Sequence, residues 1–301
     1  MLIPLDVPTS MHPIFLDNHK AITHDTNNLM LFAVDQKIEH LNGDFYGNSI
    51  DITANQPDHI FQIANRGRIG ALATHLGLIA RYGAHYKDIN YIIKLNAKTN
   101  LIKSDSVDPL SRILWSIEDV INFKKSSGLK IRGIGYTIYL GSKYEPEMLA
   151  DAAQAIFKAH QNGLVAILWV YIRGNNIKEK NELELTTAAC GVANSLGADF
   201  AKIKTPKNIQ GFTSTDILKI ATQAAGNTKI ICSGGKSQDP KDFLKELYLQ
   251  ITEGKTAGNA TGRNIFQRSL KEAIAMTNAI SAIVYHKNEA KKAIEIFESM
   301  K

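Results

Sequence analysis

Apolar segments alternate with helical patterns along this 301-residue chain, from about residue 30 to its end. Several of these segments are almost continuously apolar, which is typical of strands that are covered by helices on both faces of a sheet. Eight of them predict strands, at residues 30–36, 70–75, 91–97, 131–140, 165–173, 199–205, 229–234 and 256–261.

The segments between the predicted strands carry apolar residues at helical spacing. The clearest patterns predict helices at residues 147–157, 182–193, 215–225 and 242–247, and a last helix from about 266 to 286. Pro109 and the pair Asp239 and Pro240 are typical of helix starts, because the first turn of a helix does not need the N–H that proline lacks.

Eight strand–helix repeats in about 270 residues predict an α/β fold, the (β/α)8 TIM barrel. A doubly wound open sheet is the main alternative, but it usually carries a glycine-rich fingerprint after its first strand. Here Ala33-Val-Asp-Gln-Lys37 stands in that place. Because no linker appears, we expect one catalytic domain over residues 30–301 and a short N-terminal extension, 1–29, that covers one end of the barrel.

Composition narrows the class of protein further. The formal charge is +6, but the basic residues are spread along the chain and no nucleic-acid motif appears. Cys190 and Cys232 lie in apolar segments, which fits reduced thiols in a cytoplasmic protein. Neither a signal peptide nor a membrane-spanning run is visible, so we expect no membrane partner. The scattered histidines predict no metal site.

Lys202 and Lys204 lie two residues apart in the predicted strand at 199–205. Residues i and i+2 of a strand face the same side, so both ammonium groups would share one interior face. Burial and a like-charged neighbour both lower the pKa of a lysine. A lysine that is neutral at about pH 7 can attack a carbonyl and form an imine. The simpler interpretation places one of the two at the strand end, in water.

Trp169, Tyr171 and Arg173 alternate along the fifth predicted strand and share one face. In a barrel, functional groups gather at the carboxyl ends of the strands. Tyr171 can transfer a proton there, and Arg173 can hold an anion through its planar fork of donors. Trp169 can form a wall that keeps an imine site dry. A packed aromatic pair beside a solvated arginine is the alternative interpretation.

Glycine-rich turns follow the last two predicted strands, with Ser233, Gly234 and Gly235 after one and Gly262 and Arg263 after the other. Glycines let backbone N–H groups approach an oxyanion closely, and these two loops of a barrel are a usual phosphate site. Together the motifs predict a phosphate cradle, although each alone is also typical of an ordinary turn.

Three further ionisable positions need an interpretation. Asp35 ends the first predicted strand, where it is either a cap or a site acid that assists proton transfer. His40 follows it and is a candidate contact for a distal phosphate. Lys94 in the third strand is the rival of Lys202, because it either forms the imine itself or supplies positive charge that lowers the pKa of Lys202.

Six motifs carry a family resemblance over nearly the whole chain from about residue 28. They are VDQKIEH at 34–40, KLNAKT at 94–99, LWVYIRG at 168–174, GADFAKIK at 197–204, SGGK at 233–236 and GRNIFQ at 262–267. In this order and spacing, they resemble the archaeal-type class I fructose-bisphosphate aldolases of the wider DeoC/FbaB group.

The resemblance implies a homo-oligomeric lyase without metal or cofactor, which cleaves fructose 1,6-bisphosphate to glycerone phosphate and glyceraldehyde 3-phosphate. It implies that Lys202 forms the Schiff base, that Tyr171 donates or accepts the proton, and that Asp35 lies in the active site. It assigns the other candidates to the phosphorylated substrate: Ser233, Gly234, Gly235, Gly262 and Arg263 to one phosphate, and Arg173, His40 and Lys204 to the rest.

The chain also departs from the family pattern. Gln36 and Lys37 follow Asp35 where many members have His-Gly, and residues 258–261 are more polar than the strand often seen there. A second hypothesis is therefore a related transaldolase-like synthase or thiolase that uses the same imine on another phosphorylated substrate. A third is a non-catalytic barrel that binds phosphorylated sugars.

Overall fold

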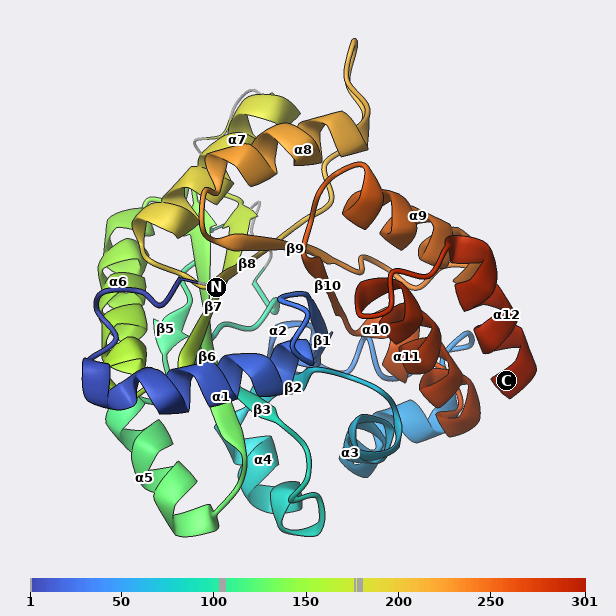
Figure 1. Cartoon of the computed structure of the whole chain (residues 1–301), viewed down its shortest axis with the longest axis horizontal. Coiled ribbons are helices and arrows are strands. Elements are labelled where there is room, and N and C mark those ends of the chain that lie inside the picture. Colours follow the sequence, from blue (N-terminus) through green and yellow to red (C-terminus); the bar gives the residue numbers. More distant parts are fainter. Residues whose placement is uncertain (1, 103–106, 176, 178–180) are drawn as a thin grey trace.

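The computed structural model describes residues 2–102, 107–175, 177 and 181–301, and its centre is a closed barrel of parallel strands (Figure 1). Neighbours around the barrel follow the order β1, β10, β9, β8, β7, β6, β3, β2. These strands are β1 (Leu29–Ala33), β2 (Ala71–His75), β3 (Tyr91–Lys94), β6 (Ile131–Leu140), β7 (Val165–Ile172), β8 (Phe200–Ile203), β9 (Lys229–Ser233) and β10 (Gly258–Thr261). The predicted (β/α)8 barrel is confirmed.

Helices connect the strands and surround the barrel (Figure 1). They are α1 (His12–Thr23), α2 (Gln36–Glu39), α3 (Pro57–Arg66), α4 (Leu76–Tyr82), α5 (Ile117–Ser127), α6 (Glu145–Gln161), α7 (Glu182–Ser195), α8 (Ser214–Ala224), α9 (Pro240–Thr252), α10 (Arg263–Phe266), α11 (Leu270–Val284) and α12 (Ala290–Met300). Short 3-10 helices lie at Thr9–Met11, Ile52–Asn55 and Gly83–His85.

Helix-start signals in the sequence were right at one position and wrong at another. Asp239 caps α9, because its carboxylate accepts hydrogen bonds from the backbone N–H groups of Lys241 and Asp242. Pro109 begins no helix and precedes β5 (Arg112–Ile113) instead.

Two predicted elements are divided in the structure. The third strand leaves the barrel after Lys94, and β4 (Asn96–Ala97) pairs with β5 in a separate antiparallel ladder. The Asn96 side chain still links this segment to β6, because its Oδ1 accepts a hydrogen bond from the N–H of Thr137 at 2.7 Å. The predicted last helix is split into α10 and α11, because Ser269 caps a new helix there, and α12 follows it.

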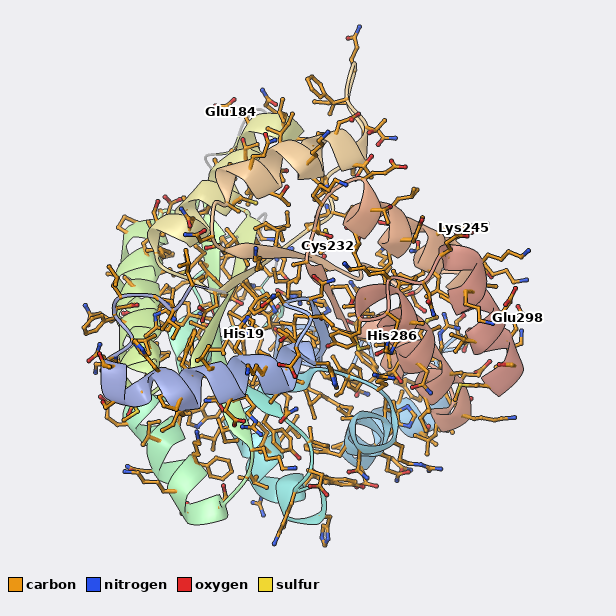
Figure 2. The ribbon with its side chains drawn as sticks, viewed as in Figure 1. His19, Glu184, Cys232, Lys245, His286 and Glu298 are labelled. Atoms are coloured by element: carbon orange, nitrogen blue, oxygen red, sulfur yellow. The ribbon has the colours of Figure 1, made fainter. Side chains whose placement is uncertain are left out.

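Side chains of one parity fill the barrel interior, including Leu31 on β1, Ile167 on β7 and Ile231 on β9. The N-terminal segment closes the amino end of the barrel, because Phe15 and Ile22 of α1 belong to the same buried cluster. Other side chains of the strands pack against the surrounding helices (Figure 2).

The structure also shows where the two cysteines and the apolar residues of α11 lie. Cys190 and Cys232 are free and buried, and burial raises the pKa of the Cys190 thiol to about 12. Ile280, Ile283 and Val284 on α11 belong to the core. Among the described residues, no helix has the length and apolar character that a membrane span requires.

A buried ionic contact fixes the N-terminal segment to the barrel. His160 on α6 is fully buried, with Nδ1 2.9 Å from both carboxylate oxygens of Asp6 and Nε2 3.2 Å from Oδ2 of Asp199. Burial disfavours the imidazolium, but the hydrogen bonds and charges of Asp199 and Asp6 raise the pKa of His160 to about 9. The charged form therefore joins the N-terminal segment, α6 and the start of β8.

This contact predicts a pH-dependent contribution to stability. The pKa of His160 in the folded chain exceeds the roughly 6.5 of an unfolded histidine, so the contribution is present below about pH 6.5 and disappears as the pH rises through about 9. Over that interval the wild type should lose about 1–2 kcal/mol more free energy of unfolding than Asp6→Asn, measured by urea unfolding. Parallel pH curves for the two proteins would contradict the assignment.

Candidate active site

Inward-facing and outward-facing residues alternate along each strand, and this alternation also places polar side chains inside the barrel at its carboxyl end. Lys94 on β3 and Lys202 on β8 are 0% and 3% exposed, and Asp35, directly after β1, is 4% exposed. Trp169 and Tyr171 point into the same space from β7, because they share the parity of the interior residue Ile167. Side chains from four strands therefore meet where a barrel carries its chemistry.

Trp169 contacts both buried lysines. Trp169 pairs with Lys202 across β7 and β8, and its ring centroid lies 5.2 Å from the Nζ of Lys202 and 5.5 Å from the Nζ of Lys94. The indole can approach only because residue 135 on β6 is glycine, since a Cβ there would lie 2.4 Å from the Trp169 ring and 3.2 Å from Lys94. Both amines thus lie against the faces of one fully buried aromatic ring.

The two lysines differ in their hydrogen bonds. The Lys94 amine donates to the backbone oxygen and to Oδ1 of Asn96, both at 2.9 Å. The Lys202 amine makes no hydrogen bond within the part of the chain that the structure describes. Burial lowers the pKa of Lys202, and lowers that of Lys94 to about 8, while the nearby Asp35 and Glu39 oppose both shifts. Lys202 is therefore the amine that is free to react.

The carboxylate of Asp35 is buried with the two lysines and does not cap a helix. It occupies the N-cap position of α2, but its side chain makes no capping hydrogen bond. Burial opposes its ionisation, but Lys202, Lys94 and His75 together hold the pKa of Asp35 below its usual value. A carboxylate that stays ionised next to a neutral amine can accept a proton or orient a hydroxyl group.

The glycine-rich turns form one structural unit beside these residues. Asn264 is fully buried, and its amide donates to the backbone oxygens of Gly234 at 2.7 Å and Lys236 at 3.0 Å. A Cβ at residue 234 would meet Thr261, and one at Gly262 would meet the backbone oxygen of Ala33 at 2.4 Å. Glycine at these positions therefore lets the turn after β9 lie against β10, and the turn after β10 lie against β1.

Asp44 joins two of the predicted phosphate contacts. Its carboxylate contacts Nδ1 of His40, and its other oxygen lies 3.6 Å from Nη1 of Arg263. Through Asp44, His40 therefore lies on the side of the glycine-rich turns. The contact of His40 with a distal phosphate stays a prediction, and Asp44 links this histidine to Arg263.

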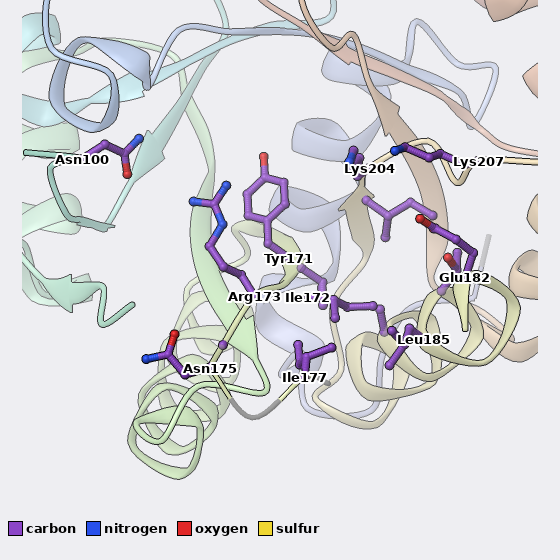
Figure 3. Close-up of a pocket in the computed structure, with 15 residues that line it drawn as sticks. Asn100, Tyr171, Ile172, Arg173, Asn175, Ile177, Glu182, Leu185, Lys204 and Lys207 are labelled. Carbon is purple, nitrogen blue, oxygen red and sulfur yellow. The ribbon is translucent and has the colours of Figure 1, made fainter. Parts of the chain in front are cut away.

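Arg173, Lys204 and Lys207 are among the residues that line a cavity of about 810 Å³ next to β7, β8 and α7 (Figure 3). Tyr171 also lines it, and in Figure 3 the side chains of Tyr171 and Arg173 extend in the same direction. The expectation that Lys204 shares a buried face with Lys202 is wrong, because β8 ends at Ile203 and Lys204 is exposed. Lys94 and Arg263 supply the positive charge near Lys202 instead.

The unusual residues after Asp35 have separate surroundings. The Lys37 amine donates to the backbone oxygen of Asn55 at 3.2 Å and lies 4.1 Å from the Phe45 ring centroid. The Gln36 amide lies 2.8 Å from the place that a Cβ of Gly262 would occupy. Gln36, and not Lys37, therefore faces the glycine-rich turns.

The polar residues in β10 do not change the barrel interior. Ala260 belongs to the interior cluster, so its neighbours Asn259 and Thr261 face the other way, and the Asn259 amide donates to the Thr261 hydroxyl. Asn259 and Thr261 therefore do not line the barrel interior.

Sequence reasoning missed several residues of the site: Glu39, Tyr139, His75, Asn264 and Asp44. Parity was a usable signal for two of them. Tyr139 has the parity of Gly135, which faces Trp169 from β6. His75 has the parity of Ala73, which lies in the interior cluster. The 3% exposed His75 has no partner for either ring nitrogen among the described residues, and burial with Lys94 lowers its pKa to about 4. Also within those residues, no group of three or more His, Cys, Asp or Glu could hold a metal.

The close contact between Trp169 and Gly135 allows a prediction about the stability of the fold. Gly135→Ala should lower the free energy of unfolding by about 1–3 kcal/mol, because the new methyl group overlaps a ring that cannot move away. Gly191→Ala on α7 is the matched control, since nothing lies within 4 Å of its added Cβ. Urea unfolding of both variants tests this, and equal stabilities would show that Trp169 can be displaced.

Comparison with known proteins gives consistent results. A family model described as DeoC/LacD family aldolase matches residues 29–268. The chain is 48% identical to "Fructose-bisphosphate aldolase/6-deoxy-5-ketofructose 1-phosphate synthase" of Methanocaldococcus jannaschii, over 98% of this chain and 94% of that one.

Two solved structures are similar over the whole barrel. A fructose-bisphosphate aldolase from Slackia heliotrinireducens has a TM-score of 0.97 and 44% identity, over 100% of this chain and 95% of the other. An archaeal fructose-1,6-bisphosphate aldolase, with its catalytic Lys covalently bound to the carbinolamine intermediate of the substrate, has a TM-score of 0.75 and 27% identity. That similarity covers 90% of this chain and 99% of the other.

Proposed function

This chain belongs to the DeoC/LacD aldolase family, and on that premise we propose that it cleaves fructose 1,6-bisphosphate through an imine on Lys202. It is a lyase of the class I fructose-bisphosphate aldolase type. The observation that carries the proposal is the buried amine of Lys202, whose pKa is lowered and which makes no hydrogen bond within the described part of the chain. The rival amine of Lys94 is held by two hydrogen bonds to Asn96.

The reaction begins when the neutral amine of Lys202 attacks the C2 carbonyl of the substrate. Loss of water gives an iminium, which accepts the electron pair of the C3–C4 bond when that bond breaks. The proton of the C4 hydroxyl leaves in the same step, and glyceraldehyde 3-phosphate departs. Protonation of the remaining enamine at C3, followed by hydrolysis, releases glycerone phosphate and restores the amine.

Tyr171 and Asp35 have complementary roles in these proton transfers. Burial and the charges of Asp35 and Glu39 raise the pKa of Tyr171 well above its usual value, so its hydroxyl is a proton donor at neutral pH. Asp35 remains ionised and can accept a proton or hold a water molecule. General acid–base help of this kind is worth about 10²–10⁴ in rate. Trp169, fully buried against both amines, excludes water from the imine.

The strand order supports a substrate with a phosphate at each end. Around the barrel, β9 and β10 lie on one side of β8 and β7 lies on the other. Ser233, Gly234, Gly235, Gly262 and Arg263 can therefore hold the phosphate near C1. Arg173 and Lys204 lie across Lys202 from them and line the cavity that would receive the second phosphate.

Borohydride reduction in the presence of substrate tests the nucleophile. We expect a stable adduct on Lys202 in the wild type and none in Lys202→Met. The adduct should form in Lys219→Met, an exposed control on α8. Peptide mapping by mass spectrometry identifies the modified lysine. An adduct on Lys94 in the wild type would overturn the assignment of Lys202.

A second activity is suggested by the relative that is 48% identical, whose name includes 6-deoxy-5-ketofructose 1-phosphate synthase. Cleaving that product between C3 and C4 gives glycerone phosphate and 2-oxopropanal. The same enamine on Lys202 would therefore serve both reactions, with 2-oxopropanal in place of glyceraldehyde 3-phosphate. The two reactions differ only in the acceptor, which lies on the side of Arg173.

The charge of Arg173 should separate the two reactions. Arg173→Gln should raise the KM for fructose 1,6-bisphosphate by about 10-fold or more, because a phosphate loses a charged hydrogen bond, and leave the KM for 2-oxopropanal unchanged. Steady-state assays of cleavage and of 6-deoxy-5-ketofructose 1-phosphate formation provide both values. If the wild type does not cleave fructose 1,6-bisphosphate but forms the other product, the leading substrate is wrong.

A further inference from the structure

Tyr139 is a fully enclosed aromatic residue that contacts the proposed proton donor directly. It pairs with Tyr171 across the parallel strands β6 and β7, and the two rings stack with centroids 6.1 Å apart and planes inclined by 25°. Tyr139 is 2% exposed. Its position is therefore fixed by the barrel, and it supplies a rigid wall for the ring of Tyr171.

The hydroxyl of Tyr139 has a single recorded partner in the described residues, the carboxylate of Glu39 at the end of α2. It donates to Oε1 of Glu39 at 3.4 Å. This is longer than the roughly 2.7–2.8 Å of an optimal O–H···O bond, as catalytic hydrogen bonds often are before a substrate is bound. The backbone oxygen of Glu39 also accepts the N–H of Asn100 at 2.8 Å, which ties this end of α2 to the segment after β4.

The Glu39 carboxylate is surrounded by ionisable groups of the site. Burial and Asp35 raise the pKa of Glu39, and the positive charges of Lys94, His40 and Lys202 oppose this rise. Two more cations face the Tyr139 ring, with the Nζ of Lys98 and the Cζ of Arg173 each 5.9 Å from its centroid. Glu39 in turn raises the pKa of Lys202 and of Tyr171.

We propose that Glu39 and Tyr139 are positioning residues of the lyase reaction, which hold the Tyr171 ring at the reacting carbon and set the charge around the Lys202 amine. This inference rests on the proposed function of Lys202 and Tyr171. Neither residue needs to touch the substrate. Tyr139 acts through the stacked ring of Tyr171, and Glu39 acts through the Tyr139 hydroxyl and through its negative charge.

The chain contains a matched control on the same strand. The hydroxyl of Tyr136 on β6 donates to Oδ2 of Asp151 on α6, also at 3.4 Å, and Tyr136 is fully buried. Tyr136 faces the helices around the barrel, because it stands on the opposite parity from Tyr139 along β6. Tyr136→Phe and Asp151→Asn therefore remove the same chemical groups on the outer side of this strand.

The test compares Tyr139→Phe with Tyr136→Phe in cleavage and in borohydride trapping. Tyr139→Phe should lower kcat by about 10-fold, because a loosened proton donor is misplaced, with KM and the yield of the Lys202 adduct unchanged. Tyr136→Phe should keep the wild-type kcat. Equal kcat values for the two variants would overturn the inference, and so would a lost adduct in Tyr139→Phe.

Glu39→Gln tests the charge independently and covers the case in which Tyr139→Phe does not fold. The acidic limb of the kcat/KM profile reports the deprotonation of Lys202. Removing the Glu39 charge lowers the pKa of Lys202, so this limb should move to lower pH, whereas Asp151→Asn should not move it. An unmoved limb in Glu39→Gln would refute the role of Glu39. If the wild type itself neither cleaves a substrate nor forms an adduct, the proposed function fails instead.

Discussion

Two amines, those of Lys94 and Lys202, are buried at one end of a closed barrel, and the rest of the site is arranged around the cost of burying them. A buried ammonium group is strongly disfavoured unless hydrogen bonds or opposite charges compensate. Lys94 receives that compensation from Asn96. Lys202 makes no such hydrogen bond within the described residues, and burial lowers the pKa of its amine although Asp35 and Glu39 oppose that shift. A lowered pKa increases the share of neutral, nucleophilic amine.

The carboxylates of the site limit how far burial lowers the pKa values of the two lysines. Asp35 and Glu39 both raise the pKa values of the two lysines, which counteracts burial. Asp35 itself remains ionised because the lysines are close, while the pKa of Glu39 is raised. The environments of Asp35 and Glu39 thus shift the pKa values of two carboxyl groups in opposite directions, although only a few residues separate them.

The two ends of the barrel have different tasks. Contacts at the amino end stabilise the fold, and the carboxyl end holds the candidate active site. At the amino end, α1 fills the opening with Phe15 and Ile22, and His160 fixes the N-terminal segment through Asp6 and Asp199. At the carboxyl end, glycines replace side chains wherever two parts of the site must approach closely, at residues 135, 234 and 262. The strand order then places the glycine-rich turns and Arg173 on opposite sides of β8.

The sequence by itself determined the barrel, because near-continuous apolar runs at regular spacing permit few other arrangements. It also determined the face shared by Trp169 and Tyr171, since parity along one strand is a local property. The prediction that Lys204 shares a buried face with Lys202 was wrong because β8 ends at Ile203. A strand boundary depends on pairing with neighbouring strands, which the local sequence does not show.

Only the tertiary structure decided which side chains meet. Tyr139 contacts Glu39 although 100 residues separate them, and Trp169 contacts both Lys94 and Lys202 from three different strands. These contacts depend on strand register and on distances of a few ångströms across the barrel. No local pattern encodes them, because the free energy that fixes them comes from packing between segments far apart in the chain.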